Sequence, residues 1–109
     1  MSNWIKYCCL ILLCLCTVFS HARNLRVYGY VVDNDNIGIE LANVVILNAD
    51  KPIGTSTNKN GYYELMLEQT DTIVLSYSMI GYTTIQQRLI EPHDVININV
   101  QLLTDEQLL

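Results

Sequence analysis

The chain has 109 residues, of which 50% are hydrophobic, and its six basic and eleven acidic side chains give a formal net charge of −5. The basic residues are scattered and form no stripe that would neutralise a phosphate backbone, which argues against a nucleic acid partner. A chain of this length builds one domain.

Residues 1–22 predict a secretory signal peptide. Lys6 supplies a positive charge, residues 8–19 form an unbroken apolar run, and Ser20-His21-Ala22 place small residues before a cleavage site. The apolar run is shorter than the roughly 20 residues with which a helix spans a bilayer. We therefore expect an exported protein that is cleaved after Ala22.

The cysteines all belong to this leader. The mature chain is thus expected to have no thiol for a disulfide, a nucleophile or a zinc site. A lipoprotein signal ending at Cys16 is the alternative to cleavage after Ala22, but Leu15 is bulky where such signals take a small residue. The four positions are Cys8, Cys9, Cys14 and Cys16.

Residues 23–102 predict a single all-β domain. Short runs of alternating or continuous apolar residues are separated by turn-forming residues, and no stretch follows a helical period. This pattern is typical of an antiparallel, Greek-key-like β-sandwich of about seven strands. We expect the strands at residues 27–33, 43–47, 54–57, 62–67, 72–78, 82–89 and 95–102.

Asn60-Gly61 is a strong turn signal, because both residues tolerate the positive φ of a tight strand-joining turn. It predicts a hairpin between the small-residue strand at 54–57 and the aromatic strand at 62–67.

The last strand has the clearest alternation, and residues 103–109 after it present no apolar face, so we expect a flexible tail there. The predicted core includes Ile73, Leu75, Tyr77, Ile96, Ile98 and Val100.

No catalytic or metal-binding pattern stands out. Asp33-Asn34-Asp35 begins like a calcium loop but lacks the later ligands of that loop. Ser56 and Lys59 match a Ser-x-x-Lys motif by letter, but they fall on a strand rather than a helix start. His93 has neither a nucleophile elbow nor a second metal ligand near it in sequence. We therefore expect no enzyme activity, no cofactor and no metal.

Six tyrosines of the mature chain are the remaining candidates. Exposed rings would stack on sugars, whereas on paired strands most tyrosines are half-buried packing residues whose hydroxyls reach water. Packing is the interpretation we favour, with sugar binding as the alternative. The six are Tyr28, Tyr30, Tyr62, Tyr63, Tyr77 and Tyr82.

Four motifs follow one another along the mature chain. They are Val27-x-Gly29-x-Val31-x-Asp33, Ile39-x-Leu41-Ala42-Asn43-Val44, Gly54-Thr55-Ser56-Thr57-Asn58-x-x-Gly61-x-Tyr63-x-Leu65 and Leu75-Ser76-Tyr77-x-x-Ile80-Gly81-Tyr82. In this order they resemble the carboxypeptidase regulatory-like domain, a transthyretin-like sandwich common in exported proteins of the Bacteroidetes.

The resemblance implies that the motif residues maintain structure and that none is catalytic. Asn58 stands where the family usually has Asp, and its side-chain oxygen can still cap the turn. The structural residues implied are Gly29, Gly54, Thr57, Asn58, Gly61, Tyr63, Tyr77, Gly81 and Tyr82.

The resemblance also implies a function. In that family the domain is often the first periplasmic piece of a TonB-dependent outer-membrane receptor that imports glycans. We therefore expect the N-terminal accessory or interaction domain of such an uptake receptor, or a truncated form of one. Its expected location is the periplasm or the periplasmic face of the outer membrane, and its expected partner is a periplasmic or outer-membrane protein. The alternative is a free-standing secreted protein that binds carbohydrate or another protein.

Overall fold

The computed structural model describes residues 3–4, 24–68 and 71–105. The predicted signal peptide therefore lies almost entirely outside the described residues, as does the end of the predicted tail. Within the described part of the chain, no helix has the length and apolar character needed to cross a membrane.

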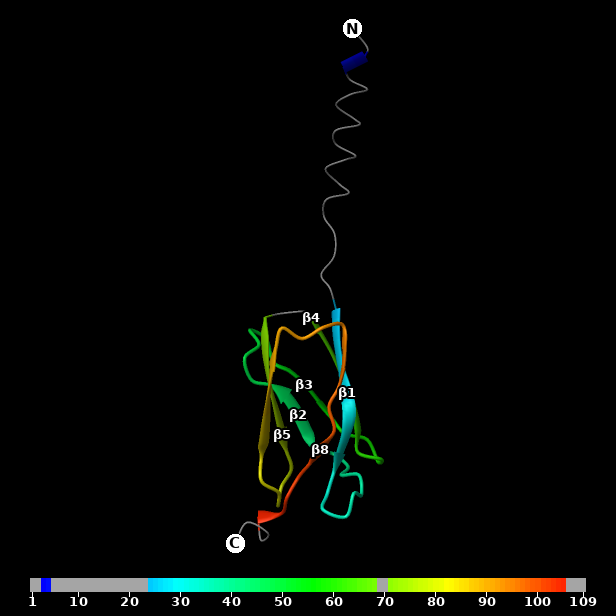
Figure 1. Ribbon diagram of the computed structural model, residues 1–109, viewed down its shortest axis with the longest axis vertical. Helices are drawn as coiled ribbons and strands as arrows, with labels where there is room; N and C mark the ends of the chain where they lie inside the picture. Colours follow the sequence, from blue (N-terminus) through cyan, green and yellow to red (C-terminus); the bar gives the residue numbers. More distant parts are fainter. Residues whose placement is uncertain (1–2, 5–23, 69–70, 106–109) are drawn as a thin grey trace.

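Eight strands form two sheets that face each other (Figure 1). The predicted all-β sandwich is thus confirmed. The strands are β1 (Asn24–Val32), β2 (Asn43–Ile46), β3 (Ile53–Ser56), β4 (Tyr62–Glu68), β5 (Thr72–Ser78), β6 (Ile85–Ile90), β7 (Val95–Asn97) and β8 (Val100–Gln101).

The first sheet is built around β1, the longest strand. β4 pairs with it in antiparallel register on one side, and β7 and β8 pair with it on the other side. The second sheet has the order β3-β2-β5-β6, and all its pairs are antiparallel.

β7 and β8 differ from the prediction in two respects. They run parallel to β1, because the chain returns after β6 to the end of the sandwich where β1 begins (Figure 1). The predicted continuous strand at 95–102 is also interrupted at Ile98 and Asn99. An added Cβ at Gly29 would collide with the Ile98 carbonyl, so the glycine permits this close approach, and the Tyr30 N–H donates to Asn99 Oδ1 at 2.9 Å.

The predicted hairpin across Asn60-Gly61 is wrong, although the turn itself is present. β3 pairs with β2 in one sheet, and β4 pairs with β1 in the other, so the turn carries the chain between the sheets. Gly61 has the expected positive φ of 81°. A local turn signal does not specify the partners of the strands that it joins.

Residues near Tyr82 also differ from the predicted strand at 82–89. β6 begins only at Ile85, and Tyr82 forms an isolated bridge with Thr104. The Thr83 N–H donates to the Leu103 carbonyl at 2.8 Å, so the first residues of the predicted tail are hydrogen-bonded to this corner.

The core lies between the two sheets and draws on every second residue of the long strands. Leu25, Val27 and Val31 of β1 face the second sheet, because successive side chains of a strand point to opposite faces. Of the predicted core residues, Ile73, Leu75, Tyr77 and Val100 are buried, whereas Ile96 and Ile98 are partly buried and pack against the others.

Candidate functional site

The nine residues of the sequence motif do not form one site. Thr57, Asn58 and Gly61 meet in the turn between β3 and β4, and Tyr63 meets Tyr77 between the sheets. The other four lie apart: Gly29 in β1, Gly54 in β3, and Gly81 with Tyr82 in the turn between β5 and β6.

Thr57 is the one buried polar residue within the described part of the chain, at 2% exposure. Its Oγ1 accepts a hydrogen bond from the Ala42 N–H at 2.9 Å and donates to the Ile39 carbonyl at 2.5 Å. The Thr57 N–H also donates to the Ala42 carbonyl at 3.0 Å. Thr57 therefore supplies the partners that the loop before β2 needs in the sandwich interior.

Asn58 closes the turn with its side chain. Its Oδ1 accepts from the N–H groups of Asn60 and Tyr62 at 2.9 and 3.0 Å, and its own N–H donates to the Tyr62 carbonyl at 2.9 Å. An aspartate at this position has an oxygen at the same place, which explains how Asn58 substitutes for it.

Tyr63 and Tyr77 join the two sheets. Their hydroxyl oxygens are 2.8 Å apart, and the rings meet edge to face with centroids 5.5 Å apart. The Tyr63 hydroxyl donates to the Ile98 carbonyl at 2.7 Å, so the Tyr77 hydroxyl is the donor between the two tyrosines. Burial raises the pKa of both hydroxyls, and the hydrogen bond to Tyr63 raises the pKa of Tyr77 further. Both groups remain protonated at neutral pH.

A second group of side chains lies on the outer surface of the first sheet, and we call it the tyrosine face: Arg26, Tyr28, Tyr30, Tyr62 and Glu64. The antiparallel register of β1 and β4 places Tyr28 opposite Glu64 and Tyr30 opposite Tyr62. The rings of Tyr30 and Tyr62 meet edge to face at 5.4 Å, and Tyr30 is 48% exposed.

Arg26 connects the polar members of the tyrosine face. Its Nε lies 3.0 Å from Glu64 Oε1, and its guanidinium carbon lies 4.8 Å from the centre of the Tyr28 ring. The hydrogen bond from Arg26 lowers the pKa of Glu64, and the same bond raises the pKa of Arg26. Arg26 and Glu64 were not among the residues predicted for a site, although both share the alternation that places Tyr28 and Tyr62 on this face.

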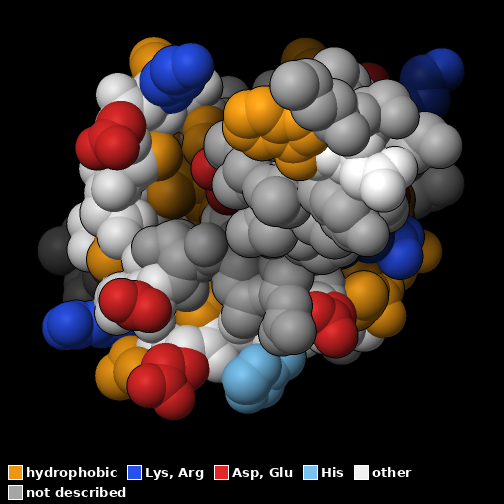
Figure 2. Space-filling view, turned by 90° about the horizontal axis from the view of Figure 1, so that it is seen from above, with side chains coloured by type: hydrophobic (Ala, Val, Ile, Leu, Met, Phe, Trp, Pro, Cys, Tyr) orange, Lys and Arg blue, Asp and Glu red, His pale blue; other side chains and the backbone are white. Residues whose placement is uncertain are grey.

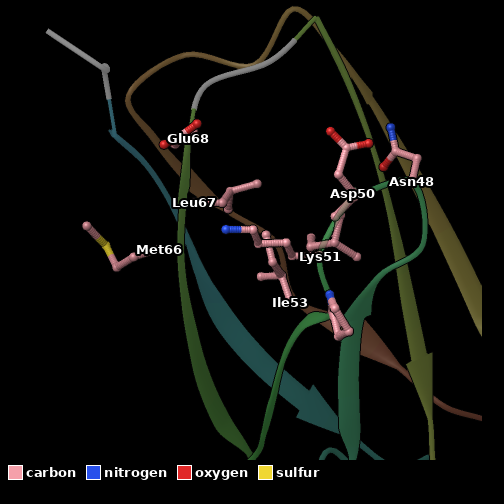
Figure 3. A pocket seen from close by; sticks show the side chains of 10 residues that line it. Asn48, Asp50, Lys51, Ile53, Met66, Leu67 and Glu68 are labelled. Atoms are coloured by element: carbon pink, nitrogen blue, oxygen red, sulfur yellow. The ribbon is translucent and has the colours of Figure 1, made fainter.

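A cavity of about 720 Å³ opens between the edge strands β3 and β4, at the end of the sandwich where β1 begins. In Figure 3, Leu67 of β4 faces Lys51 and Ile53 across it. Acidic, basic and hydrophobic side chains are interspersed around this end of the molecule, with no large area of one charge (Figure 2). The lining residues are Ile46, Asn48, Ala49, Asp50, Lys51, Pro52, Ile53, Met66, Leu67 and Glu68.

Metal-binding geometry is not found in the part of the chain that the structure describes, where no three side chains of His, Cys, Asp or Glu come together. The surface features of the described residues are an aromatic face and a cavity. Together with the fold they define a small β-sandwich module.

Comparison with known families identifies the module. The CarboxypepD_reg-like domain family matches residues 27–109, and the chain belongs to this family. The expected resemblance is thus confirmed, and this domain is a β-sandwich module. A search among curated proteins finds no match.

Solved structures of similar fold include several 1,2-dioxygenases. Catechol 1,2-dioxygenase from Acinetobacter radioresistens matches with 14% identity and a TM-score of 0.65, over 77% of this chain and 53% of that one. Hydroxyquinol 1,2-dioxygenase from Pseudomonas putida DLL-E4 matches with 7% identity and a TM-score of 0.66, over 80% and 58%. 3-Chlorocatechol 1,2-dioxygenase from Rhodococcus opacus 1CP matches with 10% identity and a TM-score of 0.63, over 79% of this chain and 62% of that one.

These neighbours correct one expectation. We expected no enzyme activity because the sequence shows no catalytic pattern, and that expectation was wrong, since solved structures of this fold are enzymes. Identities of 7–14% show a common fold alone, because one fold hosts many functions. The chain spans 53–62% of the length of these three enzymes.

Proposed function

We propose that the chain is an exported protein-interaction module that acts as the N-terminal accessory domain of a TonB-dependent outer-membrane uptake receptor. The observation that carries this proposal is the family match over residues 27–109, which takes in nearly all of the described sandwich. The signal-peptide pattern of residues 1–22 supports export to the periplasm. The open sheet edges and the acidic composition suit contact with another protein.

Fractionation and crosslinking in a Bacteroidetes host test this proposal. The full chain, carrying an affinity tag, should be found in the periplasm or with the outer membrane, and it should crosslink to a receptor. A variant without residues 1–22 is the matched control and should stay in the cytoplasm. Periplasmic protein that crosslinks to nothing would contradict the receptor role, and cytoplasmic full-length protein would contradict export.

Glycan binding by the tyrosine face is a second candidate. The observation that favours it is the exposed Tyr30 ring, which meets the half-buried Tyr62 ring beside the Arg26–Glu64 ion pair. Aromatic rings stack on sugars, and charged groups on the same surface bond to sugar hydroxyls. NMR titration with starch oligosaccharides should shift the amides of β1 and β4. Tyr30→Ala should abolish the shifts, and Ile80→Ala, at a 94% exposed site in the turn between β5 and β6, should leave them unchanged. No shift at millimolar sugar would remove this candidate.

A further inference from the structure

The two edges that bound the cavity are open. β3 pairs only with β2 and β4 only with β1 among the described strands, so each has one side without a neighbouring strand. β4 has seven residues and is the longer of the two. An open edge exposes N–H and C=O groups that another chain can extend.

The hydrogen bonds of β1 show which groups of β4 point outward. The Ile98 N–H donates to the Tyr28 carbonyl at 2.9 Å, so the even-numbered residues of β1 bond towards β7. Its odd-numbered residues therefore bond towards β4, where they are opposite Tyr63, Leu65 and Leu67. The backbone groups of the even-numbered β4 residues consequently point away from the sheet.

Tyr62 confirms this alternation and also limits the open edge. Its carbonyl accepts from the Asn58 N–H at 2.9 Å, and its N–H donates to Asn58 Oδ1 at 3.0 Å. The outward groups at Tyr62 are thus taken by the turn. The next outward positions are Glu64 and Met66, which lead directly to the mouth of the cavity.

We propose that this edge and cavity bind an extended peptide of a partner protein, which adds to β4 as a strand. The inference rests on the proposed role as a protein-interaction module and names the chemistry of the partner. Main-chain hydrogen bonds to Glu64 and Met66 hold the peptide, and alternate side chains distinguish one peptide from another.

The side chains of β4 specify the peptide's pattern. A strand added beside β4 has alternate residues on the core side, next to Leu65 and Leu67, and Leu67 lines the cavity that accepts apolar groups. Its other residues lie on the outer face beside Glu64 and Glu68, where opposite charges on adjacent strands stabilise pairing. The preferred peptide therefore alternates apolar and basic residues.

Charge around the cavity favours the same peptide. Of the described lining residues, Asp50 and Glu68 are acidic, and Lys51 is the one cation. Glu64 extends the acidic character along the edge, although it also pairs with Arg26. The chain as a whole has a net charge of −5, which attracts a basic segment at long range.

Three synthetic peptides with capped ends test the site: Lys-Val-Lys-Val-Lys-Val-Lys and the two versions in which Glu or Ser replaces every Lys. The lysine peptide should bind the mature domain most tightly and the glutamate peptide most weakly. Binding of the lysine peptide to the wild-type domain should slow amide hydrogen exchange at Glu64 and Met66. Exchange that changes elsewhere and not at these residues would overturn the proposal, as would the absence of binding by all three peptides at millimolar concentration.

Met66→Pro removes one outward N–H without touching the ladder to β1, and edge strands tolerate proline at such positions. It should weaken binding of the lysine peptide about tenfold or more. Arg88→Pro on the edge strand β6 is the matched control. The Leu47 N–H donates to the Val74 carbonyl, and Arg88 is opposite Val74, so its N–H also points outward. This control should bind as the wild type does.

Glu68→Lys tests the charge without changing the backbone. It should weaken binding of the lysine peptide and strengthen binding of the glutamate peptide, and equal affinities in both proteins would overturn the predicted charge preference.

Crosslinking to a receptor separates this inference from the proposed function. A Met66→Pro domain that still crosslinks, together with a wild type that binds no peptide, would overturn the strand-addition site alone. A wild type that binds peptide and crosslinks to no receptor would contradict the receptor role alone.

Discussion

At the scale of single residues, the turn between β3 and β4 supplies hydrogen-bond partners to buried backbone and brings backbone segments close together. The Thr57 hydroxyl satisfies one donor and one acceptor of the loop before β2, and it does so inside the sandwich. Gly61, four residues later, adopts a positive φ and approaches the Val31 carbonyl so closely that no Cβ fits. Thr57 thus bonds to backbone of the loop before β2, and Gly61 approaches backbone of β1.

Thr57→Val keeps the side-chain shape and deletes the hydroxyl. It should lower the free energy of unfolding by about 1–3 kcal/mol, because the Ala42 N–H and the Ile39 carbonyl are left without this partner in the interior. Urea denaturation measures the change. Thr55→Val, on the half-buried side of β3, is the control and should be close to neutral. Equal stability of the two variants would show that the hydroxyl network contributes nothing.

Gly61→Ala should destabilise the domain by roughly 1 kcal/mol or more, because alanine is strained at positive φ. Gly81→Ala is a matched control, since Gly81 has a φ of 89° and its added Cβ would meet no atom within 4 Å. Gly61→Ala should therefore be the more damaging of the two. The difference in melting temperature between the variants measures the cost of the clash between an added Cβ at Gly61 and the Val31 carbonyl. Equal melting temperatures would contradict this explanation.

At the scale of elements, the two sheets are connected by a polar link as well as by apolar packing. Tyr63 comes from β4 in the first sheet and Tyr77 from β5 in the second, and Ile98 lies in the interruption between β7 and β8. Tyr63 is central, because its hydroxyl contacts both of the others. Tyr63→Phe removes the hydrogen bonds to the Tyr77 hydroxyl and to the Ile98 carbonyl, whereas Tyr77→Phe leaves the bond from Tyr63 to Ile98 in place.

The raised pKa values of these tyrosines predict how stability depends on pH. A hydroxyl whose pKa is higher in the folded state than its usual value of about 10 keeps its proton when the unfolded chain has lost it. Stability is therefore full below about pH 10 and falls as pH rises further, by at most about 1.4 kcal/mol per pH unit for each buried tyrosine. Urea denaturation between about pH 8 and about pH 11 measures the slope.

Tyr77→Phe should make that slope shallower. The matched control is Tyr30→Phe, which also removes one hydroxyl but at a ring that is 48% exposed, and it should keep the steeper slope. A Tyr77→Phe variant with the wild-type slope would show that this hydroxyl does not drive the alkaline loss of stability.

At the scale of the whole molecule, one apolar core supports both sheets. Ile73, Leu75 and Tyr77 of β5 are fully buried, and they belong to the same core cluster as Leu25 and Val27 of β1. A domain of this size is stable by about 5–15 kcal/mol. Damage to the core at any point should therefore affect the whole domain.

Ile73→Ala should lower the free energy of unfolding by about 2–5 kcal/mol, since it leaves a cavity in a fully buried position. Thermal and urea unfolding should remain a single transition. Ile80→Ala at the 94% exposed position should change stability by less than about 0.5 kcal/mol. A similar effect of the two substitutions would mean that the core lies elsewhere.

The sequence by itself determined the class of fold, most of the strand positions and the turn at Gly61. These follow from alternation and turn chemistry, which depend only on neighbouring residues. It also indicated the family and the buried faces of β5 and β8. The family match and the two-sheet structure confirm these predictions.

Only the tertiary structure decided which strands pair. Local pattern does not distinguish a hairpin from a turn that crosses between sheets, and so β3 and β4 were predicted to pair although they lie in different sheets. The parallel pairing of β7 and β8 with β1 also depends on contacts between residues far apart in the chain. The cavity and the open edge of β4 follow from the same long-range pairing, because they exist only where β3 and β4 separate.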